Sequence, residues 1–119
     1  MQKPTIIQTE MVVAVDIDNT LIRRNPLGTI TLPYGSSIQN FEPIVEHIEL
    51  VKSYSQRGFF VILWSHGGFQ HAQMTMNALK LDRYVNLVMT KPSKHIDDKE
   101  SVEDIVGTRV FISPTPNQK

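Results

Sequence analysis

Residues 12–21 read Val-Val-Ala-Val-Asp-Ile-Asp-Asn-Thr-Leu, a short apolar run followed at once by two aspartates one residue apart. The apolar run has the length and composition of a buried strand, and Asn19-Thr20 supplies the turn chemistry that ends it. Acidic groups at the carboxyl end of a buried strand lie where open α/β sheets bind their ligands. Two carboxylates held this close are costly unless a positive group joins them. Asp16 and Asp18 therefore indicate a site for a cation and an oxyanion substrate.

The composition narrows the class of protein. A chain of 119 residues is expected to form one domain, and its 12 basic and 12 acidic residues balance to a formal charge of zero. This balance argues against the electrostatic grip of general nucleic-acid binders, although a nucleotide or a nucleic-acid end remains open as substrate. The absence of cysteine excludes disulfides, thiolate catalysis and zinc–thiolate sites. With no secretory or membrane-spanning pattern, we expect a cytoplasmic protein with no membrane partner.

The apolar pattern alternates between strands and helices. Strands are predicted at residues 11–15, 59–64, 84–89 and 109–112, with a weak strand at 95–96; helices are predicted at 44–58, around 72–79 and at 101–105. Such alternation predicts a single Rossmann-like α/β domain, with a mostly parallel sheet of order 3-2-1-4-5 and helices on both faces. This domain is expected to span residues 11–112, after an N-terminal arm (1–10) and before a flexible C-terminal tail (113–119).

Residues 22–40 show no helical period. Gly28, Pro33, Gly35 and the alternation over residues 29–32 predict a hairpin or flap after the first strand. The connections are too short for an inserted cap domain. We therefore expect an open site roofed at most by residues 22–35, in which Arg23-Arg24 is read as a solvated stretch.

Further polar residues follow the other predicted strands. In chain order, the polar residues at the strand ends are Asp16, Asp18, Ser65, Lys91, Asp97 and Asp98. The carboxyl ends of parallel strands meet at one edge of a sheet, so one pocket is expected to hold them all. The acids suit Mg²⁺, while the hydroxyl and the ammonium suit phosphate oxygens. A carboxylate is also a competent nucleophile toward phosphorus. The set predicts phosphoryl transfer.

These motifs resemble those of the haloacid dehalogenase (HAD) superfamily, in its small uncapped type. The first family motif, an apolar strand followed by Asp-x-Asp-x-Thr, corresponds to residues 12–20. The second, a strand ending in Ser or Thr, corresponds to residues 61–65. The third is a lysine, here Lys91, and the fourth is an acidic pair after a short strand, here residues 96–98. The order of the four motifs gives the resemblance its force.

The resemblance implies a role for each catalytic residue. Asp16 would be the nucleophile that accepts the phosphoryl group. Asp18 would protonate the leaving oxygen and then help to deprotonate the attacking water. Ser65 and Lys91 would bind phosphate oxygens, with Lys94 as an alternative lysine.

The resemblance also implies a Mg²⁺ site. Its ligands would be Asp16, the backbone carbonyl of Asp18, and Asp98, with Asp97 near the metal but not bound to it. The roles of Asp97 and Asp98 could also be exchanged. Glu100 is a candidate for a further acid of the family. Thr20 and His66 are included among the substrate-binding residues. Neither His66 nor His71 has the spacing of a transition-metal site, and both are expected to cap or flank the second helix.

Three classes of function are compared. The leading one is a Mg²⁺-dependent phosphoric monoester hydrolase that forms an aspartyl-phosphate and acts on a phosphorylated small molecule or a nucleic-acid end. Residues 96–99 are similar to deoxyribonucleotidases and to the phosphatase part of polynucleotide kinase–phosphatases. A nucleotide or a polynucleotide 3′-phosphate is therefore the first substrate to test. A receiver domain is rejected, because its acceptor aspartate would follow the third strand, which here ends at Lys91. A non-catalytic or regulatory HAD-like phosphate-binding protein is the alternative. Uncapped relatives act on large substrates or close their sites as homo-oligomers.

Overall fold

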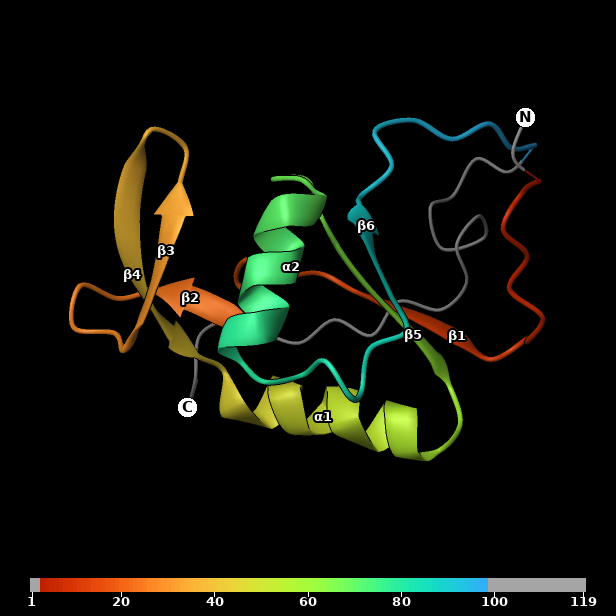
Figure 1. Ribbon diagram of the computed structural model, residues 1–119, viewed down its shortest axis with the longest axis horizontal. Helices are drawn as coiled ribbons and strands as arrows, with labels where there is room; N and C mark the ends of the chain where they lie inside the picture. Colours follow the sequence, from red (N-terminus) through yellow and green to blue (C-terminus); the bar gives the residue numbers. More distant parts are fainter. Residues whose placement is uncertain (1–2, 99–119) are drawn as a thin grey trace.

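The computed structural model describes residues 3–98, which form an α/β fold with two three-stranded sheets (Figure 1). The elements follow one another as β1 (Val12–Val15), β2 (Ile22–Arg24), β3 (Ile30–Tyr34), β4 (Ser37–Pro43), α1 (Val45–Gln56), β5 (Phe60–Ser65), α2 (Phe69–Ala78) and β6 (Leu87–Thr90). Within residues 3–98, neither helix combines the length and the apolar character that spanning a bilayer requires.

The first sheet is parallel and has the order β1-β5-β6. Val15 of β1 pairs with Leu63 of β5, and Ser65 at the end of β5 pairs with Thr90 at the end of β6. The three carboxyl ends therefore lie along one edge of the sheet. This confirms the 3-2-1 part of the predicted strand order. The third strand begins later than predicted, because the side chain of Asn86 accepts from the N–H of Val61 (2.9 Å), in place of a strand backbone, while the N–H of Asn86 donates to the Val61 carbonyl (2.9 Å).

The predicted strand at residues 95–96 is wrong. Residues 91–98 contain no strand, and Ile96 is fully exposed, so this segment buries no apolar side chain that would hold it on a sheet. The predicted helix at 101–105, the strand at 109–112 and the tail at 113–119 lie outside the described residues. Residues 3–10 contain neither helix nor strand.

The second sheet is antiparallel, with the order β2-β4-β3, and forms the flap, defined here as residues 22–43. Gly35 takes a φ of 64° in the turn from β3 to β4, a conformation that costs little without a Cβ. Gly28 fits closely against the backbone of Phe41, since a Cβ there would lie 2.1 Å from the Phe41 carbonyl oxygen. The predicted flap is therefore confirmed, but it is larger than a hairpin and continues to Pro43.

Both helices pack into one apolar cluster with alternate residues of β1 and β5. The cluster contains Ile48 and Val51 of α1, Ala72 of α2, and Val61 and Leu63 of β5. On β1 the half-buried side chains belong to the same face, whereas Val12 and Ala14 on the opposite face are exposed. The prediction of helices on both faces is therefore not met within residues 3–98. Two right-handed crossovers that advance in one direction, from β1 to β5 to β6, bring both helices to the same side.

Helix α2 also joins the two sheets. It packs against β5 and β6 of the parallel sheet and against β3 of the flap, and in Figure 1 it stands between them. Its first backbone N–H, at Phe69, donates to the hydroxyl of Thr90 at the end of β6 (3.0 Å). The amino end of α2 therefore lies at the sheet edge where the predicted site is located.

Candidate functional site

A tight turn after β1 presents the two aspartates. Ile17, between them, is fully buried, and its carbonyl accepts bonds from the N–H groups of Thr20 (3.1 Å) and Leu21 (2.8 Å). Asn19 supplies the left-handed residue of the turn with a φ of 62°, a conformation that asparagine tolerates better than most residues. Asp16 and Asp18, on either side of the buried Ile17, are both partly exposed, so the turn leaves both carboxyl groups accessible.

The turn is anchored from both sides. The hydroxyl of Thr20 lies 3.5 Å from Oδ2 of Asp16, so the structure brings together these two predicted site residues. The buried imidazole of His47, on α1, bonds through Nδ1 to the carbonyl of Thr20. A carbonyl only accepts, so Nδ1 of His47 carries the proton. The N–H of Ile44 donates to the carbonyl of Leu21 (2.8 Å). Helix α1 and the end of the flap therefore fix the aspartate turn.

Ser65 ends β5, beside the aspartate turn, and its side chain is buried. Its Oγ accepts a bond from the N–H of Gly67 (2.9 Å), and its carbonyl accepts from Gly68 (3.1 Å) and Lys91 (2.9 Å). The hydroxyl does not cap α2, because Gly68 is the residue before the helix and no side chain caps it. Because the Oγ accepts from Gly67, its own proton is left for an acceptor such as a phosphate oxygen.

Lys91 follows β6, and its backbone N–H donates to the carbonyl of Ser65 (2.9 Å). Its ammonium lies over the ring of Trp64, with Nζ 6.0 Å from the ring centroid. Trp64 and Ser65 are consecutive on β5, so their side chains point to opposite faces of the sheet. Lys91 forms no ion pair with Asp16 or Asp18, all three lying in the part of the chain that the structure describes. The structure thus places the Lys91 backbone at the site and its amine over Trp64, which points to the face of the sheet opposite to Ser65.

Asp97 and Asp98 lie on the exposed segment after β6. The N–H of Asp98 donates to the side chain of Asp97 (2.7 Å). Across residues 3–98, no three histidine or acidic side chains come close enough to hold one metal ion, so this pair does not join Asp16 and Asp18. Glu100 lies outside the described residues. The metal contacts predicted for Asp97 and Asp98 stay predictions.

His71, on α2, is the site residue that the sequence reading missed. Its Nε2 lies 3.0 Å from Oδ1 of Asp18. An ionised carboxylate only accepts, so in that state of Asp18 the Nε2 atom is the donor. Its position in the sequence could have indicated this contact. His71 precedes the buried Ala72 on the first turn of α2, at the edge of the sheet that holds the aspartates. His66, predicted to contact substrate, is exposed on the loop between β5 and α2.

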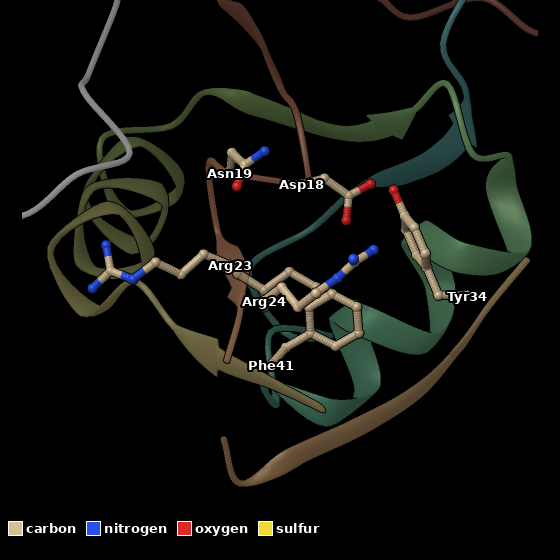
Figure 2. Close-up of a pocket in the computed structure, with 7 residues that line it drawn as sticks. Asp18, Asn19, Arg23, Arg24, Tyr34 and Phe41 are labelled. Atoms are coloured by element: carbon tan, nitrogen blue, oxygen red, sulfur yellow. The ribbon is translucent and has the colours of Figure 1, made fainter. Parts of the chain in front are cut away.

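The flap and the aspartate turn enclose a cavity of about 210 Å³ (Figure 2). Its lining residues are Asp18, Asn19, Ile22, Arg23, Arg24, Tyr34 and Phe41. Tyr34 meets both Phe41 and His71 edge to face, with ring centroids 5.9 and 5.8 Å apart. The flap therefore forms one wall of the cavity that Asp18 lines.

An ion pair stiffens the base of the flap. Arg23 on β2 contacts Glu42 on β4, with Nη2 2.9 Å from Oε2, and the amide of Asn25 bonds to the other carboxylate oxygen. The Asn25 amide, followed by the Arg23 guanidinium, lowers the pKa of the Glu42 carboxyl below its ordinary value, because both groups favour the charged form. Glu42 thereby holds Arg23 in place while the neighbouring Arg24 points elsewhere.

Comparisons with known proteins place the chain in one family. No curated protein and no solved structure matches it. A family model described as "Protein of unknown function (DUF705)" matches residues 2–115, which is nearly the whole chain and includes the entire site. The chain therefore belongs to the DUF705 family.

Proposed function

We propose that this protein is a Mg²⁺-dependent phosphomonoester hydrolase of the HAD type, without a cap domain, that works through an aspartyl-phosphate. The observation that carries the proposal is the turn at the carboxyl end of β1, which buries Ile17 and leaves Asp16 and Asp18 partly exposed. Buried Ser65 and the backbone of Lys91 stand at the neighbouring strand ends. Acids and a hydroxyl at one edge of a parallel sheet suit the binding of a phosphate.

The chemistry assigned to these residues is a double displacement. A carboxylate oxygen of Asp16 attacks phosphorus, and the bond from phosphorus to the ester oxygen breaks. Asp18 gives its proton to the departing oxygen, which leaves as an alcohol. In the second half, Asp18 removes a proton from a water molecule that attacks the aspartyl-phosphate. Inorganic phosphate departs, and both carboxylates return to their starting states.

The donor atoms at this turn fit Mg²⁺. The Asp16 carboxylate and the Asp18 carbonyl are hard oxygen donors, and Mg²⁺ is commonly held by one or two carboxylates together with waters and substrate phosphates. A third protein carboxylate is therefore not required for binding, although Asp98 or Asp97 is proposed to supply one. When bound, Mg²⁺ would neutralise charge on the phosphate and lower the repulsion of the anionic nucleophile.

His71 and Ser65 are proposed to prepare the two ends of the reaction. The imidazole of His71 orients the Asp18 carboxyl at 3.0 Å and restricts the rotation of that side chain. The Ser65 hydroxyl is oriented by the Gly67 N–H and can donate to a phosphate oxygen. Lys91 is proposed to supply positive charge to the phosphate after its amine moves away from the ring of Trp64. The contact that the amine would give up is weak, because Nζ lies 6.0 Å from the ring centroid.

The substrate class proposed first is a nucleotide or a nucleic-acid 3′-phosphate, which rests on the resemblance of the fourth motif. The open site supports it, since no cap domain covers the aspartate turn within residues 3–98. An extended substrate can therefore approach without a domain movement.

The test is hydrolysis of a panel of aryl, sugar and nucleotide monophosphates, with Mg²⁺ and with EDTA. We expect Mg²⁺-dependent release of phosphate, loss of turnover in Asp16→Asn, and an adduct of one phosphoryl group on Asp16 after rapid quenching. Asp82→Asn makes the same carboxylate-to-amide change on the exposed loop between α2 and β6 and should retain activity. Absence of turnover on the whole panel, or full activity in Asp16→Asn, would contradict the proposal.

A second candidate is a non-catalytic HAD-like phosphate-binding protein. It is favoured by the position of the Lys91 ammonium over Trp64 and by the separation of Asp97 and Asp98 from Asp16. This candidate predicts that phosphate esters bind and protect the protein against thermal unfolding, yet are never hydrolysed. The same panel separates the two candidates.

A further inference from the structure

We propose that the cavity between the aspartate turn and the flap is a leaving-group subsite, in which Arg24 binds a second phosphate group of the substrate. The inference rests on the proposed function and deepens it, because it names a substrate class for that site. The substrates are phosphomonoesters whose leaving group itself carries a phosphate or phosphodiester, as a nucleoside bisphosphate and a nucleic-acid 3′-phosphate end both do.

The two arginines of β2 differ in their partners. Arg23 is neutralised by Glu42, whereas Arg24 makes no ion pair with any residue between 3 and 98. Consecutive residues on a strand point to opposite sides, and Figure 2 shows the two guanidinium groups directed apart. The side chain of Arg24 reaches into the cavity that Asp18 also lines. Arg24 thus brings to the cavity a positive charge that no ion pair within residues 3–98 neutralises.

An aromatic platform fixes the position of that charge. The guanidinium carbon of Arg24 lies 5.2 Å from the centroid of the Tyr34 ring, which is a cation–π distance. The same ring meets His71, which bonds to Asp18. A continuous set of contacts therefore runs from Arg24 to the carboxyl that is proposed to protonate the leaving oxygen. The flap places the cation in the cavity that Asp18 lines, although the two side chains form no ion pair.

The geometry gives the cavity a direction. Asp18 stands where the ester oxygen leaves, so the rest of the leaving group lies on the Asp18 side of the phosphorus atom. The cavity continues from Asp18 along Tyr34 to Arg24. Its volume of about 210 Å³ is below the range of about 300–1,000 Å³ typical of sites that enclose a whole drug-sized ligand. It therefore accommodates one group of a substrate, with the remainder in solvent.

A guanidinium group selects for phosphate. Its planar donors match two phosphate oxygens at once, and the resulting charge-assisted hydrogen bonds are stronger than those between neutral groups. The Asp18 carboxylate in the same cavity repels anionic substrates. Arg24 offsets this repulsion only for a substrate that is long enough to contact the guanidinium group. A leaving group with a second phosphate gains this contact, and a simple monophosphate does not.

The experiment compares two substrates that differ by one phosphate, adenosine 3′-monophosphate and adenosine 3′,5′-bisphosphate, with the products identified by chromatography. We expect kcat/KM to favour the bisphosphate by about fivefold, as one charge-assisted contact from the exposed Arg24 provides. Arg24→Gln should remove that preference, so that the kcat/KM values of the two substrates become equal within about twofold. High salt should weaken the preference, because Arg24 is exposed.

Arg57→Gln is the matched control. Arg57 is exposed after α1, with its guanidinium carbon 4.5 Å from the centroid of the Tyr54 ring, so the same change is made to the same type of contact away from the cavity. Tyr34→Leu should reduce the preference as Arg24→Gln does, because the platform is lost. A preference that survives Arg24→Gln, or falls equally in Arg57→Gln, would overturn the assignment.

A binding measurement separates this inference from the proposed function. Calorimetry on Asp16→Asn protein should show tighter binding of the bisphosphate than of the monophosphate, and Arg24→Gln in that background should make the two equal. Failure of turnover with this binding difference intact would refute the hydrolase and retain the subsite. A short oligonucleotide 3′-phosphate should behave as the bisphosphate does if nucleic-acid ends are the source. Equal binding of both nucleotides, or a preference for an acidic phosphoserine peptide over the bisphosphate, would refute the subsite.

Discussion

The contact between His71 and Asp18 leads to a prediction about the protonation step. His71→Phe keeps a flat ring beside Tyr34 but removes the hydrogen bond to Asp18, which is 3.0 Å long. If Asp18 protonates the leaving oxygen, the change leaves its carboxyl free to rotate away from the ester. We expect kcat/KM to fall, and the fall to depend on the leaving group.

The size of the effect follows from exposure. A hydrogen bond to a charged group contributes about 1.5–3 kcal/mol, whereas an exposed ion pair contributes about 0–1 kcal/mol. The side chain of His71 is 10% exposed and that of Asp18 is 30% exposed, which lies between these limits. A loss of about 1–2 kcal/mol corresponds to a fall in kcat/KM of roughly 5- to 30-fold.

The assay compares an alkyl phosphate with 4-nitrophenyl phosphate. An alkoxide needs the proton of a general acid, and nitrophenolate does not, so His71→Phe should cost more with the alkyl ester. His71→Gln retains an amide donor and should recover most of the activity. An equal loss on both esters would show that His71 serves only the fold. The reasoning would be refuted by full activity in His71→Phe, or by His71→Gln as slow as His71→Phe.

Four further outcomes are expected. Ile17→Ala should lower the free energy of unfolding by about 2–5 kcal/mol, measured by urea denaturation, because Ile17 is fully buried. Gly28→Ala should lower the melting temperature, because the new Cβ would meet the Phe41 carbonyl. Asn25→Ala should raise the pKa of Glu42, measured by carboxyl NMR titration. That pKa is lowered in the fold, so the stability that Glu42 contributes is present above its unfolded pKa and is lost as the pH falls through the folded value. EDTA should abolish turnover without unfolding the protein, as monitored by circular dichroism.

The sequence predicted best where one local pattern determined the structure. The apolar run before Asp16 forms a strand and the spacing of Ile48 and Val51 forms a helix, as expected. In each case only one type of secondary structure places the apolar side chains together in the core. The strand at 95–96 failed, because two residues carry too little apolar surface to compete with solvent. A similar limit applies to boundaries, since the start of β6 depends on a cross-strand bond from Asn86 that no local pattern records.

The sequence predicted the site residues at the ends of strands, but not the contacts between side chains of different elements. Motif spacing located Asp16, Asp18 and Ser65, whose positions follow from the ends of β1 and β5. The contact of His71 with Asp18 joins residues that are 53 positions apart, and its formation depends on how α2 packs between the sheet and the flap. Arg24 could not be told from a solvated arginine, because its distinction from Arg23 lies in the tertiary partners of each.

The flap begins and ends at a single point of the fold. Ile22 at its start pairs with Pro43 at its end, and just outside it the N–H of Ile44 bonds to the carbonyl of Leu21 (2.8 Å). A segment closed in this way behaves as an insert, whose contents can change while the chain on either side keeps its path. Lengthening the turn at Gly35 would therefore add a cover over the cavity without altering the sheet that carries Asp16. Relatives with altered substrates are expected to differ in this insert before they differ in the strands.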